Sequence, residues 1–251
     1  MTAPVIMVHG AFCGGWAFDA LRGAFERAGH IVLTPDLRGH GPGGGSLMGV
    51  SMSDYARDIA ALISAQPAPP VVIGHSMGGL VAAMAATRSR TAALVQLAPS
   101  PPWGVSGSSM EEAVTAFGLL ALGPFWMQSV PPDRGLMRRF SLDRLPAAER
   151  DAAAERLTSE SGRALWETLN WWLDPMMTTA VDAQRIGAPI LTIAGGRDVV
   201  HPAATVALAA TKLGATYRVM PKMSHWLLGE PGYEDVAALA LDWLAEVRVG
   251  V

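Results

Sequence analysis

The sequence is poor in cysteine and lysine, and each shortage excludes a class of protein. Cys13 is the only cysteine among 251 residues, so the chain can form no internal disulfide, and we expect a cytoplasmic protein. Lys212 and Lys222 are the only lysines, the arginines are scattered, and the formal net charge is -3. This composition provides no basic surface for nucleic acid.

Long apolar runs are also lacking. The most membrane-like stretch, residues 113–130, is interrupted by Gly118, Gly123 and Pro124 and is barely long enough to span a bilayer. We therefore expect no membrane segment and interpret the stretch as a buried or pocket-lining helix. The first ten residues, MTAPVIMVHG, lack the basic segment of a signal peptide and lead directly into an expected strand.

Hydrophobic residues make up 50% of the chain and charged residues only 16%, which is typical of a folded globular protein. Short apolar runs predict strands at 5–8, 31–33, 71–73, 93–97, 189–195 and 216–220. Amphipathic helical patterns fall near 15–28, 52–65, 77–88, 202–213 and 232–248. This alternation predicts an α/β fold, a single domain over residues 1–251 with a mostly parallel central sheet and helices on both faces. Reactive groups in such sheets lie just past the carboxyl ends of the strands.

The alternation stops between about residues 100 and 185, where no strand-like run occurs and residues 108–123, 146–157 and 161–173 look helical. We predict that this segment is a helical cap insertion, rich in large apolar side chains, lying over one end of the sheet. An apolar pocket is expected beneath it. Its candidate residues, each with core packing as the alternative, are Phe12, Trp103, Phe125, Trp126, Trp172 and Trp226.

The stretch GHSMG at 74–78 contains the pattern G-x-S-x-G between an expected strand and an expected helix. In this setting the serine lies on a sharp, strained turn that presents its hydroxyl to a cleft. Small residues are needed two positions before and after it, because strand and helix nearly touch there. The pattern predicts Ser76 as a nucleophile, and a glycine-rich packing turn is the alternative.

A serine hydroxyl is a weak nucleophile unless a base activates it. His225 follows the last expected strand by a short loop and precedes the last helix, so we expect it at the carboxyl edge of the sheet. His201 is a weaker candidate, since it would share a loop with the acid that orients it. His75 adjoins Ser76 and should point away from the hydroxyl, and His9 is interpreted as structural.

The base needs an acid that fixes its tautomer and stabilises its cationic form. Asp198 follows the penultimate strand, in TIAGGRDVVHP, and the order Ser76, Asp198, His225 is the chain order expected for this arrangement. Asp174 lies in the helical insertion and is a poorer candidate.

Two backbone segments can supply donors for an oxyanion. The first strand ends in HGAFCGGW at 9–16, a glycine-rich reversal whose N–H groups are free to face developing negative charge. The N–H of Met77, directly after the proposed nucleophile, is the second donor.

One rival motif points to a nucleotide. GHGPGG at 39–44 satisfies G-x-G-x-x-G, and Asp58 follows at the distance a dinucleotide fingerprint requires. However, residues 42–45 lead into more loop, and no helix opens before about Ser51. We therefore favour a mobile loop at the cleft mouth and expect no cofactor and no metal.

The stretches HGAFCGGW, PDLRGHG, GHSMGG, GGRDVVHP and MSHW together resemble the α/β-hydrolase superfamily over essentially the whole chain. The first of them, with an N-terminus that skips the usual leading strands, is similar to the branch of esterases and hydroxynitrile lyases that includes plant methyl ester hydrolases. The resemblance implies an α/β-hydrolase fold with Ser76 as nucleophile, His225 as base and Asp198 as acid. It also implies that the N–H groups of Ala11 and Met77 form the oxyanion hole.

Two positions bear on the reaction within this branch. The lyases have a threonine where this chain has Gly10, and a lysine where it has Trp226. These departures favour ester hydrolysis over cyanohydrin cleavage. We therefore predict a serine esterase that cleaves carboxylic esters of hydrophobic or aromatic small molecules through an acyl-enzyme.

Other readings remain open. The same fold also supports C–C bond hydrolases, perhydrolases and lyases, and a non-catalytic ligand-binding module is a further alternative. The expected partner is the small-molecule substrate, and a homodimer is one assembly that the sequence allows.

Overall fold

A computed structural model describes residues 2–108 and 124–247 of the chain. The expected helix at 108–123 and much of the membrane-like stretch at 113–130 thus lie outside the described residues. Six parallel strands form one sheet. In spatial order they are β2 (Val32–Leu33), β1 (Val5–Val8), β3 (Val71–His75), β4 (Ala93–Leu97), β7 (Ile190–Gly195) and β8 (Thr216–Met220). All six lie where the apolar runs predict them, and the predicted fold class is confirmed.

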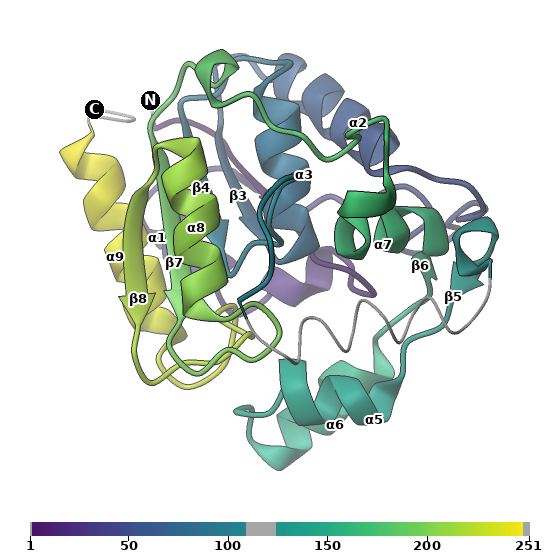
Figure 1. The fold of residues 1–251 in the computed structure, drawn as a ribbon. Coiled ribbons are helices and arrows are strands. Elements are labelled where there is room, and N and C mark those ends of the chain that lie inside the picture. The colour runs from purple at the N-terminus through teal and green to yellow at the C-terminus, as the bar shows by residue number, and fades with distance from the viewer. Residues whose placement is uncertain (1, 109–123, 248–251) are drawn as a thin grey trace.

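Helices cover both faces of this sheet, which explains why the central strands are buried at every position and mostly apolar (Figure 1). On one face, α1 (Arg22–Arg27) and α9 (Tyr233–Glu246) contribute Phe25 and Trp243 to a first buried cluster. On the other, α2 (Met52–Ser64) and α3 (Met77–Ala86) contribute Tyr55 and Leu80 to a second cluster. Helix α8 (Ala203–Leu213) adds Leu213 to the second cluster.

The start of the chain departs from the expected single helix over 15–28. It forms a 3-10 turn, η1 (Gly15–Phe18), and then the short helix α1. A Cβ on Gly15 would lie 2.1 Å from the carbonyl oxygen of Thr34, so the start of η1 packs closely against the neighbouring segment. Phe18, Leu21 and Phe25 are all buried, and this spacing gave the appearance of one continuous helical face.

The described residues between β4 and β7, at 98–108 and 124–189, are called the insertion below. Its elements are η2 (Phe125–Met127), β5 (Ser129–Val130), α5 (Arg134–Leu136), η3 (Met137–Ser141), α6 (Ala147–Glu155), β6 (Glu160–Ser161), α7 (Gly162–Leu169), η4 (Trp171–Leu173) and η5 (Ala183–Arg185). The expectation that it contains no strand was wrong, because β5 and β6 pair antiparallel. Figure 1 shows α5 and α6 set apart from the body, while α7 lies nearer to α2 and the sheet.

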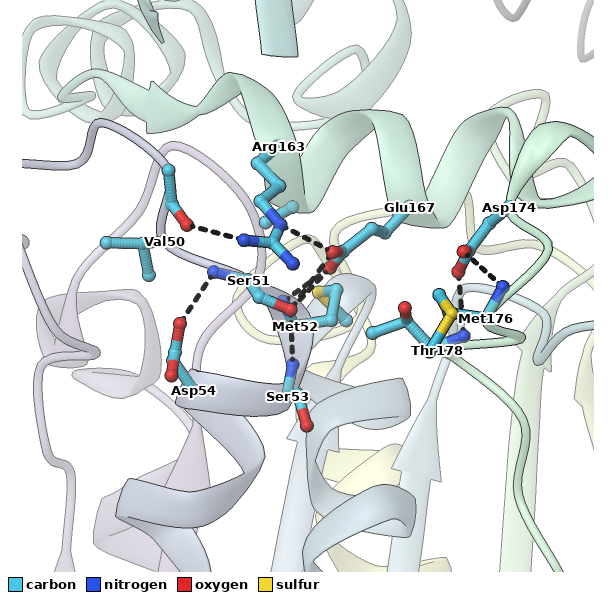
Figure 2. A network of polar contacts seen from close by, with 12 residues as sticks. Val50, Ser51, Met52, Ser53, Asp54, Arg163, Glu167, Asp174, Met176 and Thr178 are labelled. Carbon is cyan, nitrogen blue, oxygen red and sulfur yellow. Dashed lines mark hydrogen bonds and ion pairs between the residues drawn. The ribbon is translucent and has the colours of Figure 1, made fainter. Parts of the chain in front are cut away.

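Helix α7 is joined to the start of α2 by a buried carboxylate (Figure 2). Glu167 accepts hydrogen bonds from the Met52 N–H at 2.8 Å and from the Ser51 hydroxyl, and Arg163 donates to it at 2.8 Å. A negative charge at a helix N-terminus is stabilised by the helix dipole and the free N–H groups.

No helix among residues 2–108 and 124–247 is long and apolar enough to cross a bilayer.

Candidate active site

Ser76 occupies the sharp turn between β3 and α3. Its φ of 53° and ψ of -126° are rare for a residue with a side chain, and such strain is found at functional sites. A Cβ on Gly74 would lie 2.3 Å from the Gly78 carbonyl oxygen, and one on Gly78 would lie 2.2 Å from the carbonyl oxygen of His9. Strand and helix can approach this closely only with glycine at both positions.

The structure brings Ser76, His225 and Asp198 together in one hydrogen-bonded chain. The Ser76 Oγ lies 3.1 Å from His225 Nε2, and His225 Nδ1 lies 2.8 Å from Asp198 Oδ2. The three residues follow β3, β8 and β7, whose carboxyl ends meet at one edge of the parallel sheet. All three are buried, with Ser76 9% exposed.

Asp198 is held as a carboxylate that orients the His225 ring. Burial by itself raises the pKa of Asp198, but the charge and hydrogen bond of His225 outweigh it, so the pKa lies below its usual value. Its other oxygen accepts from the N–H groups of Val200 and His201, at 2.8 and 2.9 Å. An ionised acceptor at Nδ1 keeps the proton on that nitrogen and leaves Nε2 free to accept from Ser76.

Two further histidines lie beside the His225 ring, with centroid distances of 4.9 Å for His75 and 5.4 Å for His201. Burial lowers the pKa of His75 to about 3 and that of His201 to about 4, so both are neutral at physiological pH. His75 Nε2 donates to the His225 carbonyl at 2.9 Å, and His201 Nε2 lies 2.9 Å from the Ser100 hydroxyl. Neither hydrogen bond reaches Ser76.

Residues 5–239 match the model of the Alpha/beta hydrolase family. The chain belongs to this family. The expected superfamily is thereby confirmed, and membership supports hydrolase chemistry. An sn-1-specific diacylglycerol lipase of Mus musculus is 26% identical over 237 residues, which cover 89% of this chain and 75% of the lipase.

Esterases of the alpha/beta hydrolase family resemble this chain both locally and in fold, as expected. A pyrethroid hydrolase of Sphingobium wenxiniae is 40% identical over 76 residues. That match covers 30% of this chain and only 27% of the pyrethroid hydrolase. A methylesterase from Arabidopsis has a TM-score of 0.75, with 97% of this chain and 99% of the methylesterase covered at 17% identity. At that identity the likeness shows a shared fold alone.

Two backbone segments of this alpha/beta hydrolase flank Ser76. Met77 is the first residue of α3 and directly follows the serine. On the other side, a Cβ on Gly10 would lie 3.0 Å from the Ser76 Cβ, so the turn that contains Ala11 packs against the serine. His9 supports this turn, because its Nδ1 donates to the Gly10 carbonyl at 2.9 Å and its Nε2 accepts from a backbone N–H at 2.9 Å.

The predicted pocket residues fall into separate groups. Trp226 is buried and packs against His75, with a centroid distance of 5.5 Å. Phe125 contacts Trp126, which together with Trp166 lines a hollow of about 390 Å³ on the insertion. The remaining aromatic pair is Trp103 against Trp171, with Trp172 alongside. Their part in holding a substrate stays a prediction.

Two alternatives from the sequence, Asp174 as the acid and a nucleotide-binding loop at 39–44, lie in surroundings that do not match those roles. The oxygens of Asp174 accept from the backbone N–H groups of Met176 and Thr178 in its own loop (Figure 2). The glycine-rich stretch at 39–44 is not followed by a helix until α2 begins at Met52, which is not the setting of a dinucleotide fingerprint.

Sequence reasoning missed a buried polar cluster beside the site. Glu160 of β6 lies at 0% exposure, in contact with His40, with Tyr55 and with the backbone of Phe12. No motif links these residues, which come from four separate parts of the chain. The flanking residues Thr158, Ser159 and Ser161 are polar, so the sequence alone does not distinguish Glu160 from a surface residue.

Proposed function

We propose that this alpha/beta hydrolase is a serine esterase that cleaves carboxylic esters of hydrophobic or aromatic small molecules through an acyl-enzyme. One observation carries the proposal, namely the hydrogen-bonded chain from the Ser76 hydroxyl through His225 to Asp198, at 3.1 and 2.8 Å. A hydroxyl, an imidazole and a carboxylate in this order are the groups that nucleophilic acyl transfer requires.

In the first half of the reaction, Ser76 Oγ attacks the ester carbonyl carbon while His225 Nε2 takes the hydroxyl proton. The carbonyl π electrons move to its oxygen, and the N–H groups of Ala11 and Met77 stabilise the oxyanion. When the intermediate collapses, the C–O bond to the alcohol breaks and His225 returns its proton to the leaving oxygen. In the second half, water replaces the alcohol, and hydrolysis of the acyl-enzyme releases the acid and restores Ser76.

The proposed preference for apolar substrates rests on Trp226 beside the base and on exposed apolar side chains of the insertion. Trp226 directly follows the proposed base, and Trp126 and Met127 on the insertion are 38% and 61% exposed. Pockets lined by such side chains bind apolar groups better than sugars or charged peptides. Cytoplasmic location and assembly as a homodimer stay predictions of the sequence.

The test compares wild-type protein with Ser76→Ala on a series of aryl esters of increasing acyl length. We expect turnover to fall on the order of 10⁴-fold or more in the variant. A fluorophosphonate should label the wild type and not the variant. Hydrolysis by Ser76→Ala near the wild-type rate would contradict the proposal. Labelling without ester turnover, together with cleavage of a vinylogous diketone, would instead indicate a C–C bond hydrolase.

A further inference from the structure

Glu160 is a fully buried carboxylate that contacts four groups, three of them from distant parts of the chain. Its Oε1 accepts from the Tyr55 hydroxyl at 2.6 Å and from the Ser161 N–H at 2.7 Å. Its Oε2 lies 3.1 Å from His40 Nε2 and accepts from the Phe12 N–H at 3.3 Å. Glu160 thus accepts two hydrogen bonds at Oε1 and one at Oε2, with His40 beside it as an ion-pair partner.

The contact with Phe12 reaches residues 10–13, here called the oxyanion turn, which the Cys13 N–H closes on the Gly10 carbonyl at 3.4 Å. Phe12 has a φ of 65°, a left-handed conformation that costs free energy for any residue with a Cβ. The insertion binds both backbone polar groups of Phe12. Its N–H donates to Glu160, and its carbonyl accepts from the Thr158 N–H at 2.9 Å. These bonds offset the cost of the left-handed conformation.

The Phe12 N–H belongs to the peptide that joins Ala11 to Phe12, and the N–H and C=O of one peptide point in opposite directions. Holding this N–H on Glu160 therefore also fixes the direction of the Ala11 carbonyl. Without the acceptor, Phe12 would relax to a negative φ, and this central peptide would turn over. The Ala11 carbonyl dipole would then turn within the same short turn, beside the Ala11 N–H that is proposed as an oxyanion donor.

We propose that Glu160 is a positioning residue that holds the oxyanion turn in its reactive conformation. This inference rests on the proposed esterase function, because the turn matters for catalysis only if Ala11 stabilises an oxyanion. Glu160 acts through the backbone of Phe12 and belongs to the insertion, so the insertion contributes to stabilising the transition state.

The negative charge of Glu160 strengthens the hydrogen bond that it accepts from the Phe12 N–H. Burial raises the pKa of Glu160, but the contacts of His40, Tyr55 and Ser161 outweigh burial and bring the pKa below its usual value. An ionised acceptor makes a stronger hydrogen bond to the Phe12 N–H than a neutral one. In Glu160→Gln one oxygen becomes an NH₂ group, which cannot accept from an N–H, so either the Phe12 N–H or the Ser161 N–H loses its acceptor.

The experiment compares Glu160→Gln with Glu167→Gln, a matched control. Glu167 is also buried, lies in the same insertion and accepts from Ser51, Met52 and Arg163 (Figure 2). None of these bonds involves the oxyanion turn. For each protein one measures kcat and KM with an aryl acetate, the Ki of an aryl trifluoromethyl ketone, and Tm. The Ser76 oxygen adds reversibly to the ketone carbonyl, and the tetrahedral adduct places its oxyanion in the proposed oxyanion hole.

For Glu160→Gln we expect kcat to fall about 10- to 100-fold with KM within about threefold, since removing one oxyanion donor costs about 10²- to 10³-fold. The Ki of the ketone should rise by the same factor, because transition-state analogues report the same interactions. Glu167→Gln should lower Tm but leave kcat and Ki within about threefold of wild type. Equal effects of both variants on kcat and Ki, or a higher KM with kcat unchanged in Glu160→Gln, would overturn the proposal.

If Glu160→Gln does not fold, Tyr55→Phe decides by the same measurements. It removes one donor from Glu160 while filling nearly the same volume, and we expect a fall in kcat of about 3- to 10-fold with KM unchanged. Wild-type kcat and Ki in that variant would overturn the proposal. Failure of the proposed esterase function would be distinguishable, because the wild-type protein itself would then neither hydrolyse aryl acetates nor react with the ketone.

Discussion

Asp198 and Asp174 are both buried, and the structure gives them different tasks. One oxygen of Asp198 bonds the His225 ring and the other accepts from two backbone N–H groups, so the ring can adopt only one orientation. Asp174 binds two N–H groups of its own loop. These contacts make Asp174→Asn a suitable control for Asp198→Asn, because both exchanges place an amide on backbone donors in a buried setting.

We expect Asp198→Asn to lower kcat about 10⁴-fold, as the same exchange does in another triad. The asparagine NH₂ group would face His225 Nδ1 and favour the tautomer whose Nε2 carries the proton, which cannot accept from Ser76. Asp174→Asn should leave kcat nearly unchanged. Steady-state kinetics on an aryl acetate measure both, and a larger loss in Asp174→Asn would show that the acid is misassigned.

Glu230 is a second buried acid near His225. Its Oε1 accepts from the Ser224 N–H at 2.6 Å, and its Oε2 is buried without a hydrogen-bond partner in the described part of the chain. Burial raises the pKa of Glu230 from 4.5 to about 7. The folded protein therefore holds a proton that the unfolded chain releases, and stability falls as pH rises from about 4.5 to about 7.

Glu230→Gln should remove this loss, because glutamine keeps an acceptor for Ser224 and carries no charge. Relative to wild type, the variant should gain about 3 kcal/mol between pH 4.5 and pH 8, the equivalent of the shift in pKa. Urea unfolding at pH 5 and pH 8 measures the difference. A difference that is the same at both pH values would show that Glu230 does not titrate in this range.

At the scale of elements, the sharp turn at Ser76 between β3 and α3 depends on the close approach of α3 to β1. A Cβ on Gly78 would lie 2.2 Å from the carbonyl oxygens of both Val8 and His9, backbone atoms that cannot move aside. We expect Gly78→Ala to destabilise the fold by at least about 3 kcal/mol and to abolish activity.

The control is Gly187→Ala, where nothing lies within 4 Å of the added Cβ and the backbone is not left-handed. Here the exchange should be neutral or stabilising by about 0.4–1 kcal/mol. Urea unfolding measures the stability of both variants. A Gly78→Ala protein with wild-type stability would show that α3 can shift at the turn that carries Ser76.

Most elements could be predicted from the sequence because each has a local cause. The four central strands are buried on both faces and are therefore mostly apolar runs, and Ser51 and Asp54 form a capping box that marks the start of α2. By contrast, β5 and β6 have only two residues each and exist because distant segments pair. The break between η1 and α1 interrupts a continuous apolar periodicity, so the periodicity alone did not predict it.

The same distinction holds for the site. Ser76, Asp198 and His225 could be placed because each follows a predictable strand, and the carboxyl ends of parallel strands meet at one edge. Glu160 could not, since it becomes part of the site only when the insertion folds against His40, Tyr55 and Phe12. Its role is defined by tertiary contacts across about 150 residues of chain, which no short motif records.

At the scale of the whole molecule, three buried histidines are neutral in the folded protein, and its free energy of unfolding therefore depends strongly on pH. Burial lowers the pKa of His9 to about 4, of His75 to about 3 and of His201 to about 4, against 6.5 for an exposed imidazole. Between these values the unfolded chain binds protons that the folded protein does not. Stability from these groups is therefore complete above pH 6.5 and is lost as pH falls toward 4.

We expect unfolding near pH 5.3 to take up about two protons, because about three enter these histidines while about one leaves Glu230. Stability should then fall by roughly 3 kcal/mol per pH unit on acidification. Calorimetric Tm values between pH 4.5 and 7, with proton uptake from buffers of different ionisation enthalpy, measure both quantities. His201→Gln should reduce the uptake by about one proton, since glutamine can still bond Ser100 but does not titrate. An unchanged uptake in this variant would show that His201 is already protonated in the fold, and a positive charge would then lie 5.4 Å from the ring proposed as the base.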